Sequence, residues 1–113
     1  MAPSSTAANE DQLDRVFHAL ANRTRRALLG RMSEGPAKVT ELAEPFAMSL
    51  PAVSKHLRVL ERAGLIERDV QGRVHRCSLQ TAALKDADEW LAFYRRFWDE
   101  TLESLARHVG DDR

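Results

Sequence analysis

The 113-residue sequence predicts a mainly α-helical domain that carries one small β-hairpin. Apolar residues recur at helical spacing in four short stretches before residue 65 and in one long stretch after residue 80. Between these stretches, two β-compatible runs flank a turn that contains glycine. Since 43% of the residues are hydrophobic, enough for one core, we expect a single domain over residues 10–113. It follows a flexible tail over residues 1–9, which are rich in Ala, Ser, Pro and Thr.

The first two expected helices are defined by apolar spacing and by caps. In the first, four apolar residues repeat with the spacing that lines one face, namely Leu13, Val16, Phe17 and Leu20. The second begins after Asn22 or Thr24, since either side chain can cap it, and ends at Gly35-Pro36.

The next two helices are expected to form a pair. Val39, Leu42 and Phe46 mark the first of them, which is short because Pro45 lacks the N–H that further helical turns need. After a tight turn over residues 47–49, the second helix spans residues 49–63. Ser49 is its cap candidate, Pro51 lies in its first turn, and Ala63-Gly64 ends it.

A hairpin and a long helix complete the chain. Residues 65–70 and 73–79 flank Gln71-Gly72, a two-residue turn with glycine in second place. Residues 81–109 contain neither Gly nor Pro and repeat apolar residues at helical spacing. At 1.5 Å per residue this helix would be about 40 Å long, which is long for so small a domain.

Two helices joined by a turn and followed by a β-hairpin have the order of a winged helix-turn-helix, whose second helix enters the major groove of DNA. We therefore expect the helix over residues 49–63 to read DNA. The start of this helix and its face opposite the apolar stripe supply the candidate DNA-binding residues, which are Ser49, Leu50, Pro51, Ser54, Lys55, Arg58 and Arg62. On the hairpin, Gln71 and Arg73 are the candidates. The alternatives are a solvated basic helix face and an edge hairpin kept soluble by its charges. We expect His56 to be a structural hydrogen-bonding residue.

The distribution of charge agrees with DNA binding. Lysine plus arginine equals aspartate plus glutamate at 17 each, so the total charge indicates no polyanionic partner. However, residues 49–79 carry six basic and three acidic side chains, whereas residues 80–113 carry five and eight. The middle of the chain therefore suits phosphate binding. The neutral total leaves open the alternative of a winged-helix module that binds a protein partner.

Two runs of sequence carry a resemblance. VFHALANRTRRALLGRM and VTELAEPFAMSLPAVSKHLRVLERAGLIERDVQGRVHRCSL resemble the arsenic-repressor (ArsR/SmtB) family of bacterial regulators, and the likeness covers residues 12–109. The resemblance implies a homodimer held by the first and last helices, a recognition helix over residues 49–63, a wing over residues 65–79 and repression of the gene's own promoter. The expected dimer-interface residues are Leu13, Phe17, Trp90, Tyr94, Phe97, Trp98, Leu102 and Leu105. The aromatic residues among them could instead line a ligand pocket.

The sequence departs from the family's metal sensors. Where their helix carries a Cys-x-Cys-type run after Glu-Leu, this chain continues from Glu41-Leu42 without sulfur, and Asp86-Ala87-Asp88 lacks the histidine of the zinc site. The resemblance is therefore to the non-metal-sensing branch, and we expect no metal and no cofactor. Cys77, the single cysteine, cannot form an intrachain disulfide. It is either a redox sensor or a small buried strand residue.

Other classes of protein find no support. The sequence has no glycine-rich phosphate loop and no recognisable catalytic triad, so we do not expect an enzyme. It also has neither an apolar run of some 18 residues nor a signal peptide, so we expect a cytoplasmic protein that does not enter a membrane. The expected partners are double-stranded DNA and a second copy of the chain, and the sequence identifies no small-molecule inducer.

Overall fold

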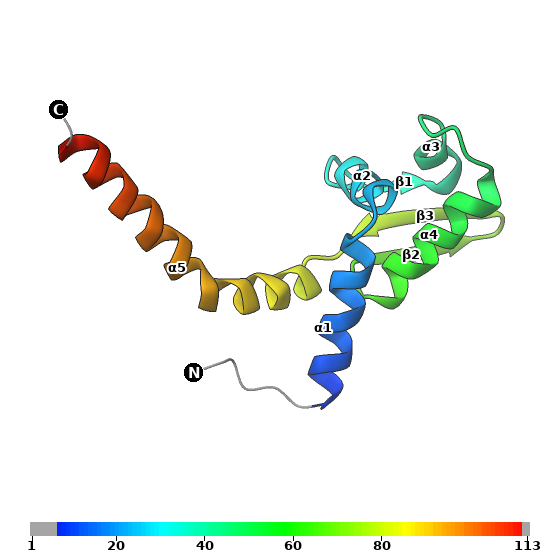
Figure 1. Cartoon of the computed structure of the whole chain (residues 1–113). Helices are drawn as coiled ribbons and strands as arrows, with labels where there is room; N and C mark the ends of the chain where they lie inside the picture. The colour runs from blue at the N-terminus through cyan, green and yellow to red at the C-terminus, as the bar shows by residue number, and fades with distance from the viewer. Residues whose placement is uncertain (1–6, 112–113) are drawn as a thin grey trace.

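The computed structural model describes residues 7–111 and confirms the predicted order of elements (Figure 1). The helices are α1 (Ala7–Leu20), α2 (Arg23–Met32), α3 (Val39–Ala43), α4 (Leu50–Arg62) and α5 (Ala82–Asp111). The strands are β1 (Ala37–Lys38), β2 (Ile66–Gln71) and β3 (Val74–Leu79). The fold is therefore mainly helical, and α3, α4 and the β2–β3 hairpin follow one another as in a winged helix-turn-helix.

The sheet has three antiparallel strands in the order β1-β3-β2, one strand more than the predicted hairpin. β1 pairs with β3 through Ala37 opposite Cys77 and Lys38 opposite Arg76. A strand of two residues shows no alternation of apolar and polar side chains, so periodicity could not predict it. β1 fixes the start of α3 beside the hairpin.

The turn of the hairpin lies one residue later than predicted. Gln71 pairs with Val74, so the two turn residues are Gly72 and Arg73, with glycine in first place. Gly72 has a φ of 64°, in the left-handed region that glycine occupies without a steric penalty. The expected Gln71-Gly72 turn is therefore wrong by one position, because two-residue turns also exist in a form that requires glycine first.

Two predicted boundaries also differ. α1 begins at Ala7, inside the expected tail, as the high helix propensity of alanine allows; the rest of that tail lies outside the described residues. α3 ends at Ala43, so residues 44–49 connect it to α4 in place of the shorter turn expected over residues 47–49. Pro45 has no N–H to continue the helix. Phe46, beyond the helix, still packs against the core.

The core lies between the helices and one face of the sheet. The predicted stripe of α4 is confirmed, since Val53, Leu57 and Leu60 are fully buried. The same core cluster contains side chains from α1, α2, α3, β2, β3 and α5, together with Leu65 before β2. The largest fully buried side chains are Val16, Leu28, Met32, Leu42, Val53, Leu57, Leu60, Leu65 and Cys77.

α5 leaves this body as an arm. Its first turns pack on α1, where Ala83 and Ala87 are buried, and the remainder runs away from the domain (Figure 1). The molecule measures 64 × 38 × 21 Å and has a radius of gyration of 18.5 Å. A compact domain of this length would have a radius of gyration of about 13 Å. A single copy therefore leaves much of α5 without a packing partner. None of the helices over residues 7–111 is both long and apolar enough to span a membrane.

Candidate nucleic-acid interface

Local signals fix both ends of α4. The Ser49 side chain accepts a hydrogen bond from the backbone N–H of Ala52 at 3.2 Å, so the predicted cap is confirmed. At the other end, Gly64 N–H donates to the carbonyl of Glu61 and Leu65 N–H to that of Leu60. Gly64 has a φ of 75°, which completes a Schellman motif. The helix is thus held at a defined length beside the wing.

The side of α4 opposite the buried stripe faces solvent. Pro51 and Ser49 are exposed, Leu50 is 46% exposed, and Ser54 is half-buried. Three cations extend from the same helix, and the turn of the wing adds a fourth together with the exposed Gln71. No described residue forms an ion pair with any of these cations, which are Lys55, Arg58, Arg62 and Arg73. They are available to bind phosphates or the acceptor atoms of guanine.

A groove of about 440 Å³ separates the start of α4 from the wing. Its walls come from β1, α3, α4, β2, the wing turn and β3. The lining residues are Lys38, Val39, Thr40, Leu50, Ser54, Arg68, Arg73, Val74 and His75. Sequence reasoning missed Lys38, Thr40, Arg68 and His75 as members of the site. The positive charges of Lys38 and Arg68 were the only signal, because the fold alone brings these distant segments together.

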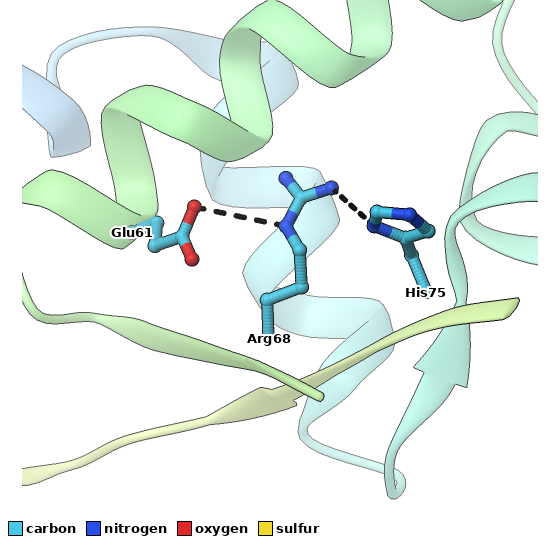
Figure 2. A network of polar contacts seen from close by, with 3 residues as sticks. All are labelled: Glu61, Arg68 and His75. Atoms are coloured by element: carbon cyan, nitrogen blue, oxygen red, sulfur yellow. Dashed lines mark hydrogen bonds and ion pairs between the residues drawn. The ribbon is translucent and has the colours of Figure 1, made fainter. Parts of the chain in front are cut away.

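Arg68 connects α4 to both strands of the wing (Figure 2). Its Nε lies 3.6 Å from Glu61 Oε1 and its Nη1 lies 3.3 Å from His75 Nδ1. Its Nη2 is buried and has no hydrogen-bond partner within the described part of the chain. The wing is therefore attached to α4 by side chains as well as by the backbone.

A second arginine connects α4 to α1 and α2. Arg25, which is 9% exposed, donates from Nε to the carbonyl of Ala19 and from Nη2 to that of His18, each at 2.9 Å. Its Nη1 donates to His56 Nδ1 at 3.2 Å, so His56 makes a structural hydrogen bond, as expected. Burial, with the charges of Arg25 and Lys55, lowers the pKa of His56 and favours the neutral imidazole that this bond requires.

Cys77 lies in the core of the sheet. Its side chain is fully buried, and burial raises the pKa of its thiol. Because the thiolate is the reactive form, both observations agree with the alternative of a small buried strand residue. Across residues 7–111, no group of three or more His, Cys, Asp or Glu side chains could hold a metal ion.

The expected dimer-interface residues lie along α1 and α5. Leu13 and Phe17 are half-buried against the core, and Phe17 meets Trp90 edge-on with ring centroids 5.6 Å apart. Trp90 in turn contacts Tyr94 at 4.8 Å. Further along α5 the apolar side chains are more exposed, at 50% for Phe97, 46% for Trp98, 61% for Leu102 and 57% for Leu105. An apolar stripe of this extent is typical of an interaction surface.

The helix pair, the wing and the unpaired cations define a winged helix-turn-helix DNA-binding protein. A family model described as a helix-turn-helix domain matches residues 20–69. The HTH-type transcriptional regulator Rv2034 of Mycobacterium tuberculosis (strain ATCC 25618 / H37Rv) is 41% identical over 106 residues, which cover 88% of this chain and 92% of the relative. The transcriptional repressor SdpR of Bacillus subtilis (strain 168) is 33% identical over 90 residues, which cover 80% and 100%.

Solved structures agree with these relatives. The crystal structure of the ArsR family transcriptional regulator RHA00566 matches with a TM-score of 0.76 and 43% identity, over 88% of this chain and 97% of that one. The solution structure of the homodimeric winged helix-turn-helix DNA-binding domain Mb0332 from Mycobacterium bovis matches with a TM-score of 0.62 and 32% identity, over 92% and 95%. The chain belongs to the ArsR family. It is a DNA-binding transcriptional regulator, a non-enzymatic kind of protein, and no observation favours the protein-binding alternative.

Proposed function

We propose that the protein is a homodimeric cytoplasmic repressor that blocks promoters, including that of its own gene. The observation that carries this proposal is the exposed face of α4, whose three cations have no ion-pair partner among the described residues. The start of this helix faces the wing across the groove. A dimer that occupies promoter DNA excludes polymerase. The relative SdpR, itself a repressor, supports this direction of regulation.

In the proposed dimer, two copies of α1 and α5 pack together through the exposed apolar stripe of α5. The radius of gyration of 18.5 Å, well above that of a compact domain, supports such a partner, as does the homodimeric state of the Mb0332 domain. A twofold axis would place the two α4 helices about 34 Å apart, in successive major grooves of a near-palindromic site. Leu102→Glu would bury a charge at this interface and should give monomers in analytical ultracentrifugation.

Within each half-site we assign base reading to α4 and backbone contact to the wing. Arg58 is exposed in the middle of α4 and is our candidate for a guanine contact, whereas Arg73 at the turn of the wing is our candidate for a phosphate contact. The assignment makes different predictions for the two residues. Arg58→Ala should cost about 1–3 kcal/mol and relax specificity at one base pair, while Arg73→Ala should weaken all sequences similarly and lower the salt dependence.

Fluorescence anisotropy tests the proposal. The protein is titrated into DNA from immediately upstream of its gene and into a scrambled duplex, at several salt concentrations. We expect selective binding with a steep salt dependence. Arg23→Ala is the matched control, because Arg23 is an exposed arginine on α2 outside the proposed interface. Equally weak binding to both duplexes, or unchanged affinity in the Arg58 and Arg73 variants, would contradict the proposal.

A further inference from the structure

We propose that the groove between α4 and the wing receives one phosphodiester group of bound DNA, held by Lys38, Arg73 and the imidazole N–H of His75. The inference rests on the proposed DNA binding and adds a contact that lies outside α4. It assigns a role to three segments that a sequence-based interface omits, namely β1, the start of α3 and the middle of β3.

The lining of the groove selects an anion. Three of its nine residues are cations, and none is aspartate or glutamate. Thr40 and Ser54 add hydroxyl groups, which donate readily to phosphate oxygens. The edge of a base presents donors as well as acceptors, whereas this lining offers mostly donors. A phosphate oxygen therefore fits the groove better than a base does.

The contact between Arg68 and His75 determines which imidazole nitrogen of His75 can donate a hydrogen bond in the groove. A guanidinium group has no acceptor, so in the 3.3 Å contact Arg68 Nη1 donates and His75 Nδ1 accepts (Figure 2). The hydrogen of the neutral imidazole must then be on Nε2, which is free to donate to a ligand. Glu61, 3.6 Å from Arg68 Nε, holds the guanidinium in place. Arg68 and Glu61 are thus positioning residues for His75.

The charge of Arg68 is incompletely compensated. Its side chain is 15% exposed, its only ion-pair contact is the 3.6 Å approach of Glu61, and its buried Nη2 has no partner among residues 7–111. A largely buried cation with an unsatisfied donor is costly unless a counter-charge lies close by. A phosphate in the groove, which Arg68 lines, would provide that counter-charge when DNA binds.

A methylphosphonate scan tests the proposal, because this replacement removes the charge of one chosen phosphate. The DNA is the duplex that binds selectively in the anisotropy experiment, substituted at symmetric positions of both half-sites, in phosphate-free buffer so that inorganic phosphate does not compete. We expect one position at which the wild type loses about tenfold in affinity, as for a lost hydrogen bond to a charged group. In the Lys38→Ala and His75→Phe variants, the methylphosphonate at that position should lower affinity by less than about twofold, because each variant has already lost part of the contact.

Salt dependence separates the two kinds of contact. Lys38→Ala should reduce the slope of log affinity against log salt by about 0.9, since one cation fewer displaces counterions. His75→Phe should lower affinity and leave the slope unchanged, since the donor is neutral. Arg76→Ala is the matched control: Arg76 is an exposed neighbour of His75 outside the groove, and its variant should keep the full tenfold sensitivity.

The outcomes distinguish this proposal from the general one. If the wild type binds selectively but every methylphosphonate weakens it and both variants equally, the groove holds no phosphate and the regulator assignment stands. If the wild type has no selective DNA binding, both proposals are overturned. Lys38 is exposed on β1, whereas His75 is half-buried on β3. If the His75 variant fails to fold, the Lys38 variant alone tests whether the groove holds a phosphate.

Discussion

Replacing the buried Arg25 with methionine should destabilise the fold more than any single substitution on the DNA-binding face. Methionine fills much of the same volume but removes three hydrogen bonds, to the carbonyls of His18 and Ala19 and to His56. The two carbonyls lie in the last turn of α1, where the regular helical pattern ends, although the His18 carbonyl also accepts from the backbone N–H of Ala21 at 3.2 Å. The hydrogen bond that the Arg25 backbone N–H donates to Asn22 Oδ1 survives, since it does not involve the Arg25 side chain.

The size of the effect follows from the burial of each bond. A hydrogen bond to a charged group contributes about 1.5–3 kcal/mol when buried and less when water can replace it. The Arg25–Ala19 bond is buried and the other two are partly buried. Relief from burying a charge offsets part of the loss, so we expect a net cost of about 3 kcal/mol. For a domain of this size, that lowers the melting temperature by about 12–24 °C.

Thermal unfolding followed by circular dichroism measures this change, at one fixed protein concentration because dimer dissociation contributes to the transition. Arg26→Met is the matched control. Arg26 is the next residue in the same helix, is exposed, and makes one side-chain bond, to the carbonyl of Leu20 at 2.7 Å. We expect its replacement to cost less than about 1 kcal/mol. Equal melting temperatures for the two variants would refute the view that Arg25 joins α1 to α4.

Three further predictions follow from single residues. The pKa of His56 is lowered in the folded state, so on acidification the unfolded state takes up its proton first. The free energy of unfolding should therefore fall as the pH drops below about 6.5. Urea titrations at several pH values should show a smaller fall for His56→Gln over the same range. Gly72→Val should destabilise the wing by about 1–2 kcal/mol in thermal unfolding, since φ is 64° there, whereas Gly30→Ala, in helical backbone with open space around the glycine, should be neutral or stabilising. Cys77 should react with a thiol reagent at least about 100-fold more slowly in the folded protein than in urea, and rapid labelling of the native protein would reopen the redox alternative.

Elements whose determinants are local could be predicted from the sequence. The Ser49 cap, the glycine after α4 and the apolar stripe of α4 depend on residues a few positions apart, and the structure confirms all three. The turn of the wing was displaced by one residue because Gly72 is compatible with either place in a two-residue turn. Only the pairing of Gln71 with Val74 decides between them.

The polar network behind the interface could not be predicted in the same way. Arg25 and His56 are 31 positions apart, and no periodicity relates them. Arg68 and His75 are seven apart on opposite strands, so their contact depends on the register of the hairpin. Lys38 joins the groove only because β1 pairs with β3, and two residues are too short a strand for any pattern to reveal. The sequence therefore predicted the bounds of α4 and its place before the wing but not which residues hold that helix in place.

The same polar network also determines the position of α4 relative to α1 and α5. α5 packs on α1, the carbonyls at the end of α1 bind Arg25, and Arg25 binds His56 on α4. In the proposed dimer α1 and α5 form the interface, so the separation of the two recognition helices depends on this chain of contacts. A small rotation of α4 about its attachment would move its exposed face out of register with the major groove, since the half-site spacing is fixed by the DNA helix. Arg25→Lys should therefore weaken binding to the selective duplex more than to the scrambled one, because a single ammonium cannot reproduce the three directed bonds of the guanidinium.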